Sequence, residues 1–263
     1  MICIHTHHDP RLSAYRNVPD AELLSRHGLF VAEGRLVVRR LLADTALSTQ
    51  SVMVTEAAME SLADVLLTRD GVPVYIVPQS VMNEIVGFNI HRGCLAIGER
   101  PPRRSLVDLT TSTRRLVAME RVGNADNVGS IVRNAMALGA DGILIGPSCA
   151  DPFYRKAIRT SMAAALTMPF ADAQPWPAVL QDLHTEGWTV IALTPSPAAL
   201  PLADVADIVR GERTVLVVGH EGEGLSADSL AASSYQARIP MASGVDSVNV
   251  ATAVAIALYE LTR

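Results

Sequence analysis

Residues Val215-Leu-Val-Val-Gly-His-Glu-Gly-Glu-Gly-Leu-Ser226 carry the clearest fold signal in the chain. A run of apolar residues leads directly into a loop with glycines at 219, 222 and 224. A continuous apolar run is typical of a parallel strand that helices cover on both faces. Glycine permits left-handed backbone and lets a ligand approach the main chain closely. The stretch predicts a buried parallel strand ending in a ligand-binding loop, although a plain strand–turn–helix connection gives the same pattern.

The order of these glycines disfavours a dinucleotide-binding fold. The pattern is G-x-x-G-x-G, whereas dinucleotide folds use G-x-G-x-x-G with an acidic residue about 20 positions later, at the end of the next strand. Here that strand ends in Arg238-Ile-Pro240, and Asp246 follows the proline in a loop. A nucleotide-dependent oxidoreductase therefore remains only a weak alternative.

Two further polar loops follow apolar strands. The first is Glu120-Arg-Val-Gly-Asn-Ala-Asp-Asn-Val-Gly-Ser-Ile-Val-Arg-Asn-Ala135, in which Arg133 lies off the apolar stripe of the expected helix. The other, Ile239-Pro-Met-Ala-Ser-Gly-Val-Asp-Ser-Val-Asn-Val250, leads into a terminal helix that we expect to begin at Asp246 or Ser247. Asparagine near a helix start is either a cap or a ligand group, and each segment alone leaves both interpretations open.

Composition indicates a globular chain without a disulfide framework. Hydrophobic residues make up 49% of the 263 residues and charged residues 19%, which is enough to bury a sizeable core. No apolar run reaches about 18 residues, and the first residues lack a basic and an apolar segment, so we expect neither a membrane span nor a signal peptide. Three widely spaced cysteines without a C-x-x-C pair favour a reducing, cytoplasmic location.

The charges exclude two classes of nucleic-acid or nucleotide binder. Every one of the 22 basic residues except Lys156 is an arginine, and Lys156 is not preceded by glycine, so no P-loop is present. The net charge of −5 argues against a nonspecific nucleic-acid binder. Residues 1–104 carry 11 basic and 11 acidic side chains, and residues 105–263 carry 11 basic against 16 acidic ones. Any nucleic-acid site must therefore be a local patch.

The linker Gly98-Glu-Arg-Pro-Pro-Arg-Arg-Ser105 divides the chain. We predict a smaller α/β domain over residues 1–104 and a larger, mostly parallel α/β domain over residues 105–263. Strands are expected at 29–32, 52–54, 74–77, 94–97, 116–119, 143–146, 188–193, 214–218 and 235–239. Helices are expected at 36–41, 56–67, 79–86, 128–138, 153–165, 176–186, 226–232 and 247–262.

Together, the three loops resemble the SpoU (TrmH-type) family of RNA ribose 2′-O-methyltransferases. The first matches the family's N-x-x-N-x-G-x-x-x-R element, the second its G-x-E-x-x-G-L-S element, and the third its I-P-M…S-x-N-V element. The resemblance covers residues 115–263, and Phe30–Arg35 more loosely resembles the family's N-terminal substrate-binding domain. It implies a SPOUT-type α/β fold with a C-terminal trefoil knot, a homodimer through the knot region, and S-adenosyl-L-methionine as cofactor, with no metal. The implied reaction methylates a ribose 2′-hydroxyl in structured RNA, with rRNA favoured over tRNA.

The resemblance also assigns residues. It gives active-site roles to five polar side chains, which are Asn127, Arg133, Glu221, Ser247 and Asn249. It places the cofactor against residues of the second and third loops, which are Val218, Gly219, Glu221, Gly224, Ile239, Met241, Val248 and Asn249. The complete polar set argues against the main alternative, a non-catalytic RNA-binding relative that retains the fold.

Two basic stretches are candidates for phosphate contact. Arg35 and Arg39 lie on the N-terminal helix, and Arg155, Lys156 and Arg159 follow the second strand of the larger domain. A solvated helix face gives the same pattern, so both interpretations stay open. The cluster His5, His7, His8 and Asp9 resembles a metal site only superficially, and we expect these residues to be exposed polar groups.

Overall fold

The computed structural model describes residues 1–16, 20–87 and 93–263, which divide into two compact units. The first unit consists of Met1–Pro102 together with Phe153–Leu166. The second consists of Arg103–Pro152 together with Thr167–Arg263. A single boundary at the linker would assign residues 153–166 to the second unit, whereas their contacts assign them to the first.

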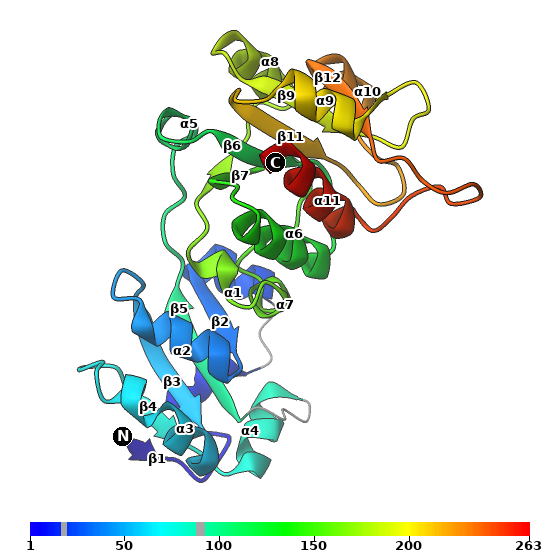
Figure 1. Ribbon diagram of the computed structural model, residues 1–263. Helices are drawn as coiled ribbons and strands as arrows, with labels where there is room; N and C mark the ends of the chain where they lie inside the picture. The colour runs from blue at the N-terminus through cyan, green and yellow to red at the C-terminus, as the bar shows by residue number, and fades with distance from the viewer. Residues whose placement is uncertain (17–19, 88–92) are drawn as a thin grey trace. The chain divides into compact units, whose positions relative to one another are not determined.

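The first unit is built on a five-stranded mixed sheet with the order β1-β4-β3-β5-β2 (Figure 1). Strands β1, β4 and β3 are parallel, and β5 runs antiparallel to both β3 and β2. One face of the sheet is covered by η1, α1 and α4. Helices α2 and α3 pack against each other, α2 also contacts β2 and β5, and α3 also contacts β3 and β4. The strands are β1 (Ile2–Cys3), β2 (Leu29–Glu33), β3 (Thr49–Val54), β4 (Val74–Ile76) and β5 (Cys94–Glu99). The helices are η1 (Pro10–Tyr15), α1 (Asp20–His27), α2 (Arg35–Ala43), α3 (Glu56–Leu66) and α4 (Gln79–Val86).

Helix α7 (Arg155–Thr160) completes this unit by packing against the edge strand β2. Glu33, at the end of β2, is buried, and its Oε1 lies 3.2 Å from Nη1 of Arg159. Its Oε2 lies 3.8 Å from Nε of Arg155, whose backbone N–H donates to Asp20 at 2.9 Å. Burial raises the pKa of Asp20, and the charge of Arg155 opposes that rise. Two buried or half-buried carboxylates therefore hold α7, because a buried carboxylate needs a cationic or hydrogen-bonding partner.

The expected helix over 153–165 is shorter than the sequence indicates. After α7 the chain takes left-handed backbone at Met162 (φ 53°) and Ala163 (φ 68°), and it resumes as the short 3-10 helix η2 (Ala164–Leu166). Left-handed backbone interrupts the hydrogen-bond ladder of a right-handed helix. The apolar run of this segment is explained by burial of Ile158 and Ala163 in the first unit.

The second unit contains a seven-stranded, fully parallel sheet with the order β10-β12-β9-β11-β6-β7-β8. Its centre is β11, in which every residue is buried, as the apolar run predicts. Helices α5, α8 and α10 pack on one face, and α6, α9 and α11 contact one another or the strands on the other. The strands are β6 (Arg115–Met119), β7 (Gly142–Ile145), β8 (Phe170–Asp172), β9 (Thr189–Leu193), β10 (Leu200–Pro201), β11 (Thr214–Val218) and β12 (Tyr235–Arg238). The helices are α5 (Leu106–Thr111), α6 (Ala125–Ala137), α8 (Ala178–Thr185), α9 (Leu202–Ile208), α10 (Ala227–Ala231) and α11 (Val250–Thr262).

Two helix starts differ from the sequence prediction because side chains cap them. The terminal helix begins at Val250, not at Asp246 or Ser247, since Oδ1 of Asn249 accepts the backbone N–H of Ala251 at 2.9 Å. Helix α6 begins three residues earlier than expected, since Asn124 caps it. Sequence patterns did not predict β1, η1, α1, α5, β8, β10 and α9. None of the helices in the described ranges is long and apolar enough to cross a membrane.

We predict that Phe153→Ala destabilises the first unit. The ring of Phe153 is buried, and its centroid lies 5.3 Å from that of Phe30 on β2. Removing a buried phenylalanine side chain typically costs about 3–5 kcal/mol. Amide hydrogen exchange should therefore accelerate in residues 29–43 more than in residues 115–119. Leu67→Ala, at an exposed position of the same unit, is the control. Equal effects of the two substitutions would show that residues 153–166 do not belong to the core of this unit.

Candidate active site

The three polar loops leave the same edge of the parallel sheet of the second unit. They follow β6, β11 and β12, and parallel strands bring their carboxyl ends to one edge, where open α/β sheets bind ligands. The sequence pattern alone predicts this placement. What it does not predict is how the loops are joined, because the joining contacts link residues about a hundred positions apart.

The second loop, residues 219–226, is closed by contacts within itself. A side chain at Gly219 would put its Cβ 2.6 Å from the backbone carbonyl carbon and oxygen of Gly224, so only glycine fits there. Gly224 has left-handed backbone (φ 70°) and donates its N–H to the carbonyl of His220 at 2.9 Å. Nδ1 of His220 accepts the N–H groups of Gly222 (3.0 Å) and Glu223 (3.1 Å). The turn therefore has a fixed backbone shape.

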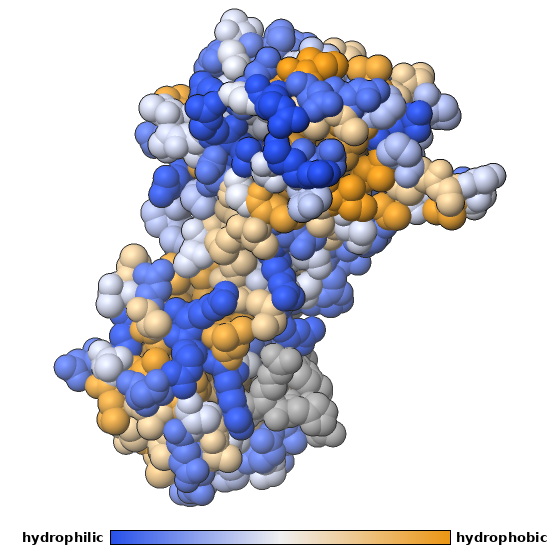
Figure 2. Space-filling view, in the orientation of Figure 1, coloured by the Kyte–Doolittle hydropathy of each residue, from blue (hydrophilic) through white to orange (hydrophobic). Residues whose placement is uncertain are grey.

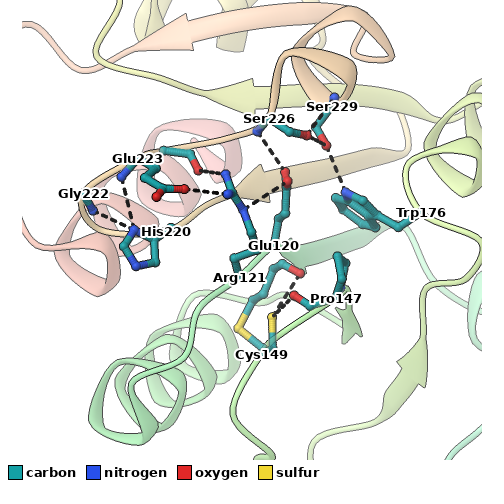
Figure 3. A network of polar contacts seen from close by, with 12 residues as sticks. Glu120, Arg121, Pro147, Cys149, Trp176, His220, Gly222, Glu223, Ser226 and Ser229 are labelled. Carbon is teal, nitrogen blue, oxygen red and sulfur yellow. Dashed lines mark hydrogen bonds and ion pairs between the residues drawn. The ribbon is translucent and has the colours of Figure 1, made fainter.

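The first loop holds the second through two charged residues at the end of β6 (Figure 3). Glu120 is buried, and its Oε2 accepts the N–H of Ser226 at 3.3 Å. Arg121 donates from Nη1 to Oε2 of Glu223 at 2.6 Å and from Nη2 to the carbonyl of Gly224 at 3.3 Å. Arg121 is itself in left-handed backbone (φ 56°), a conformation that costs a non-glycine residue about 1–2 kcal/mol.

Ser226 extends this network to the far side of the second loop. Its Oγ caps α10 by accepting the N–H of Ser229, and the two hydroxyl oxygens lie 2.9 Å apart. The indole N–H of Trp176 donates to Oγ of Ser229 at 3.0 Å (Figure 3). The second loop is therefore anchored at its C-terminal end, where α10 begins.

The first and third loops meet through two asparagines. Nδ2 of Asn249 donates to Oδ1 of Asn127 at 3.0 Å, while Oδ1 of Asn249 caps α11. Asn127 is buried near the start of α6, and further along the same helix Asn134 donates to the carbonyl of Ala251 at 2.8 Å. Helices α6 and α11 lie side by side (Figure 1). Asn249, for which the sequence left a cap and a ligand group open, is a cap that also contacts another predicted site residue.

The other three predicted active-site residues project outward. Arg133 is exposed on α6, Glu221 is exposed in the second loop, and Ser247 is exposed in the third loop, before α11 rather than in its first turn. Among the described parts of the chain, none of the three has a side-chain hydrogen bond or ion pair. Their polar groups are therefore open to an external partner.

The predicted cofactor positions combine apolar side chains with available backbone groups. Val218 is buried at the end of β11, and Ile239, Met241 and Val248 are partly exposed. Within the described segment 239–248, one backbone–backbone hydrogen bond is found, from Val245 to Ala242. Most peptide groups of the third loop are thus open to a ligand. An apolar surface with a few free backbone donors and acceptors is what an adenine ring requires.

Most of the basic candidates already have partners within the first unit. Arg39 forms a two-pronged ion pair with Asp64 and also donates to the carbonyl of Ser61 at 2.6 Å. Arg155 and Arg159 face Glu33. Arg35 and Lys156 are exposed. Binding of RNA phosphates by these residues stays a prediction. Arg35 and Lys156 are the most exposed of the five.

The possible metal ligands and the thiol nearest the loops have other contacts in the described part of the chain. No group of three His, Cys, Asp or Glu side chains in the described residues is arranged to hold a metal ion. His7 instead pairs with Glu84 at 2.6 Å. Cys149 lies near the first loop and donates to the carbonyl of Met119 at 3.3 Å. Burial raises the pKa of the Cys149 thiol, which keeps it protonated and weakly nucleophilic.

Sequence reasoning missed the residues that support the loops. Glu120, Arg121 and Glu223 were visible inside the motifs but received no role. Charged residues directly after a buried strand are a weak signal, because most such residues are solvated. Only the burial of Glu120 and the reach of Arg121 across to the second loop reveal their contribution.

The arrangement of these three loops matches a known family. The sequence model of the SpoU rRNA Methylase family matches residues 114–259, which is more than half of the chain. The chain belongs to the SpoU rRNA methylase family. The matched residues contain all three loops, so the resemblance drawn from the motifs is confirmed.

Relatives and solved structures agree with this family. An uncharacterized tRNA/rRNA methyltransferase of Mycobacterium bovis is 40% identical over 259 residues, covering 97% of this chain and 89% of that protein. An AdoMet-bound rRNA methyltransferase of Sinorhizobium meliloti superposes with a TM-score of 0.82 at 23% identity, covering 98% and 96% of the two chains. The SpoU methyltransferase AviRb of Streptomyces viridochromogenes, in complex with AdoMet, gives 0.80 at 22% identity, covering 97% and 98%. At such identities the superpositions show that the SpoU fold, with its large parallel sheet, is shared along the whole chain.

Two glycines of the second loop provide a matched test of its shape. Gly219→Ala forces Cβ into the backbone of Gly224, whereas Cβ in Gly222→Ala has its nearest neighbour at 3.5 Å, on the ring of His220. Overpacking costs about 1–3 kcal/mol, and we expect Gly219→Ala to lower Tm by about 3–10 °C. Amide exchange in residues 219–226 should also accelerate. Gly222→Ala should leave both Tm and the amide exchange rates almost unchanged. A similar fall in Tm in both variants would contradict the close approach of Gly219 to Gly224.

Proposed function

We propose that this protein transfers a methyl group from S-adenosyl-L-methionine to a ribose 2′-hydroxyl of RNA. The observation that carries the proposal is the Asn127–Asn249 hydrogen bond, which joins the first and third motifs of the family on the helix that also carries the exposed Arg133. The names of the relatives support an RNA substrate, and two similar structures contain AdoMet. Methylation at the ribose oxygen follows from the motifs that the chain shares with the family, and one protein of similar structure is an RNA 2′-O ribose methyltransferase.

The residues at the candidate site fit this cofactor. Ile239, Met241 and Val248 offer apolar contacts for an adenine ring, and the free peptide groups of the third loop offer hydrogen bonds to its edge. Gly224 is partly exposed with open space where a side chain would lie, and the buried Gly219 packs against it and shapes the turn. The bound cofactor would supply an electrophilic methyl group on a sulfonium. The chain's own residues would orient it and the ribose, since most of the barrier to such a displacement is overcome by positioning.

Arg133 is the residue that we place beside the reacting oxygen. Attack by a 2′-hydroxyl forms the new O–CH3 bond as the S–CH3 bond breaks, and the hydroxyl proton passes to water. Negative charge develops on the oxygen as the proton leaves. A guanidinium is protonated at all accessible pH values, so Arg133 acts as a fixed cation rather than as a base. Preorganised charge at a developing oxyanion is often the largest contribution to catalysis. Ser247 and Glu221 then serve to orient the ribose or the guanidinium.

The substrate is structured RNA, with rRNA favoured over tRNA. The exposed Arg35 and Lys156 of the first unit are the phosphate contacts that we favour there. Arg39, Arg155 and Arg159 are less exposed, and they would adjust their present ion pairs on contact with RNA. The free cysteines support a reducing, cytoplasmic setting.

Methyl transfer to RNA tests the proposal directly. Purified protein is incubated with unmodified rRNA or unmodified tRNA, each made by in vitro transcription, and with methyl-labelled S-adenosyl-L-methionine. Label should enter one RNA class, and the modified linkage should resist alkaline hydrolysis, because a methylated 2′-oxygen cannot attack the phosphate. Binding of RNA without incorporation into either class would favour the alternative, a non-catalytic relative that retains the fold.

Arg133→Ala should abolish methyl transfer while leaving the affinity for S-adenosyl-L-methionine within a few-fold. Losing one preorganised charge at a developing oxyanion costs about 10²–10³ in kcat. Arg133→Lys keeps the charge and loses the planar fork, so it should recover little if geometry matters. Arg210→Ala, at another exposed arginine of the second unit, is the control. Near-normal turnover of Arg133→Ala would remove this residue from the mechanism.

The proposal includes a homodimer formed around α11 and a C-terminal trefoil knot, both of which stay predictions. Helix α11 is apolar on nearly all sides, and Ile256 and Tyr259 are exposed on it, with Met136 exposed on the neighbouring α6. Figure 2 shows apolar side chains gathered over α11 and the loop that leads into it. Apolar patches of this kind commonly mark protein interfaces.

Ile256→Asp should convert the dimer to a monomer. A charge at the centre of an apolar interface is left desolvated and unpaired, which is strongly unfavourable. Because Ile256 is already partly exposed, the variant should fold and keep its circular dichroism spectrum. Size-exclusion chromatography with light scattering gives the mass of each form. Leu67→Asp, at an exposed site of the first unit, should remain dimeric. A monomeric unmodified protein at micromolar concentration would reject the dimer.

A further inference from the structure

The guanidinium of Arg121 joins two loops that are far apart in the sequence. One nitrogen lies 2.6 Å from the carboxylate of Glu223 and another 3.3 Å from the carbonyl oxygen of Gly224 (Figure 3). Its Nε is buried without a hydrogen-bond partner and lies 3.6 Å from Oε1 of Glu120. A planar guanidinium can serve two acceptors at once, which a lysine ammonium does with less directional control.

The backbone at Arg121 is arranged so that its side chain reaches the second loop. Its left-handed φ of 56° turns the chain sharply after β6, and its N–H donates to the carbonyl of Pro147 at 2.9 Å. Strained backbone at a non-glycine residue persists only where the surroundings hold it. Glu120, one residue earlier, holds the N–H of Ser226 at the end of the same loop. The pair Glu120 and Arg121 therefore contacts the loop at two separate places.

A shift of Gly224 would be transmitted to Gly219. The two glycines are so close that a Cβ on Gly219 would overlap the backbone of Gly224, so neither can move toward the other. Both are positions expected to hold the cofactor, whereas the functional groups of Arg121 point at the loop itself (Figure 3). Removing the guanidinium would release the carbonyl of Gly224, so this backbone would be held only by the contacts within the turn itself.

We propose that Arg121 and Glu223 form a clamp that fixes the cofactor-binding backbone of residues 219–224. This inference rests on the proposed function, since it concerns the same site. Both are positioning residues: they act through the loop and touch neither the methyl group nor the ribose. The clamp determines how tightly S-adenosyl-L-methionine binds, and not the rate of the chemical step once it is bound.

The two members of the clamp differ in importance. Glu223 is largely exposed (side chain 70%), and an exposed ion pair by itself stabilises a structure only slightly. Arg121 also holds the carbonyl of Gly224 and faces the buried Glu120. Loss of Arg121 should therefore weaken binding more than loss of the Glu223 charge. In a variant without Arg121, the Glu223 carboxylate has lost its ion-pair partner and should no longer affect cofactor binding.

Calorimetric titration of the full-length protein with S-adenosyl-L-methionine tests the clamp. We expect Arg121→Ala to raise Kd about 5- to 20-fold, on the scale of a lost charge-assisted hydrogen bond, and Glu223→Gln about 2- to 5-fold. The double variant should bind no more weakly than Arg121→Ala, since coupled residues are non-additive. Arg121→Lys should recover only part of the affinity. In methyl-transfer assays KM for the cofactor should rise while kcat stays within about twofold, because only cofactor binding is affected.

Arg114→Ala is the matched control. Nη2 of Arg114 also donates to a glycine carbonyl, that of Gly211, at 2.6 Å, but this exposed contact lies before β6 and β11, at the opposite ends of the strands from the three loops. Its Kd should match that of the unmodified protein. Unchanged affinity in Arg121→Ala, an additive double variant, or a fall in kcat with unchanged KM would each overturn the clamp.

Two outcomes separate the clamp from the proposed function and from simple unfolding. If the unmodified protein does not bind S-adenosyl-L-methionine, the proposed function fails; if it binds and Arg121→Ala binds equally well, only the clamp fails. If Arg121→Ala loses its folded circular dichroism spectrum, Glu223→Gln decides the matter, because its side chain is exposed and dispensable for packing. A raised Kd together with faster amide exchange at 219–226 then supports the clamp, and no change in either overturns it.

Discussion

The hydrogen bond between the carboxamides of Asn249 and Asn127 is the contact on which the site depends. The oxygen of Asn249 caps α11, and its nitrogen donates to Asn127. One side chain therefore fixes both the start of α11 and the position of the third loop against α6. An aspartate could cap the helix but has no N–H to donate, and a serine is too short to do both. Because Asn127 is buried within α6, the contact attaches the third loop to a packed helix.

The sheet of the second unit could be predicted from sequence because its signal is local. The apolar runs of β7, β9 and β11 each mark a strand by themselves, and covering helices explain why the runs do not alternate. Helix α7 could not be placed in this way. Its basic residues gave two open interpretations, a phosphate-binding surface and a solvated helix face, and neither indicated that Arg159 pairs with Glu33, 126 residues earlier. No periodicity within the helix carries information about that partner.

The residues of the candidate site were likewise easier to predict than their connections. Spacing and the parallel sheet were sufficient to bring the three loops to one edge. The start of α11 was missed because several polar residues precede it, and the choice among them depends on Asn127, 122 positions away. Glu120 and Arg121 received no role for the same reason: their partners Ser226 and Glu223 lie in another loop.

The structure separates two kinds of polar residue at this site. One group contacts other parts of the chain and fixes backbone, and it consists of Glu120, Arg121, Asn127 and Asn249. Arg133, Glu221 and Ser247 are exposed. A preorganised site needs both, since exposed groups are effective only when the scaffold that carries them cannot relax. Arg121 illustrates the first group. Its left-handed backbone costs free energy, and the two contacts that its side chain makes with the second loop offset that cost.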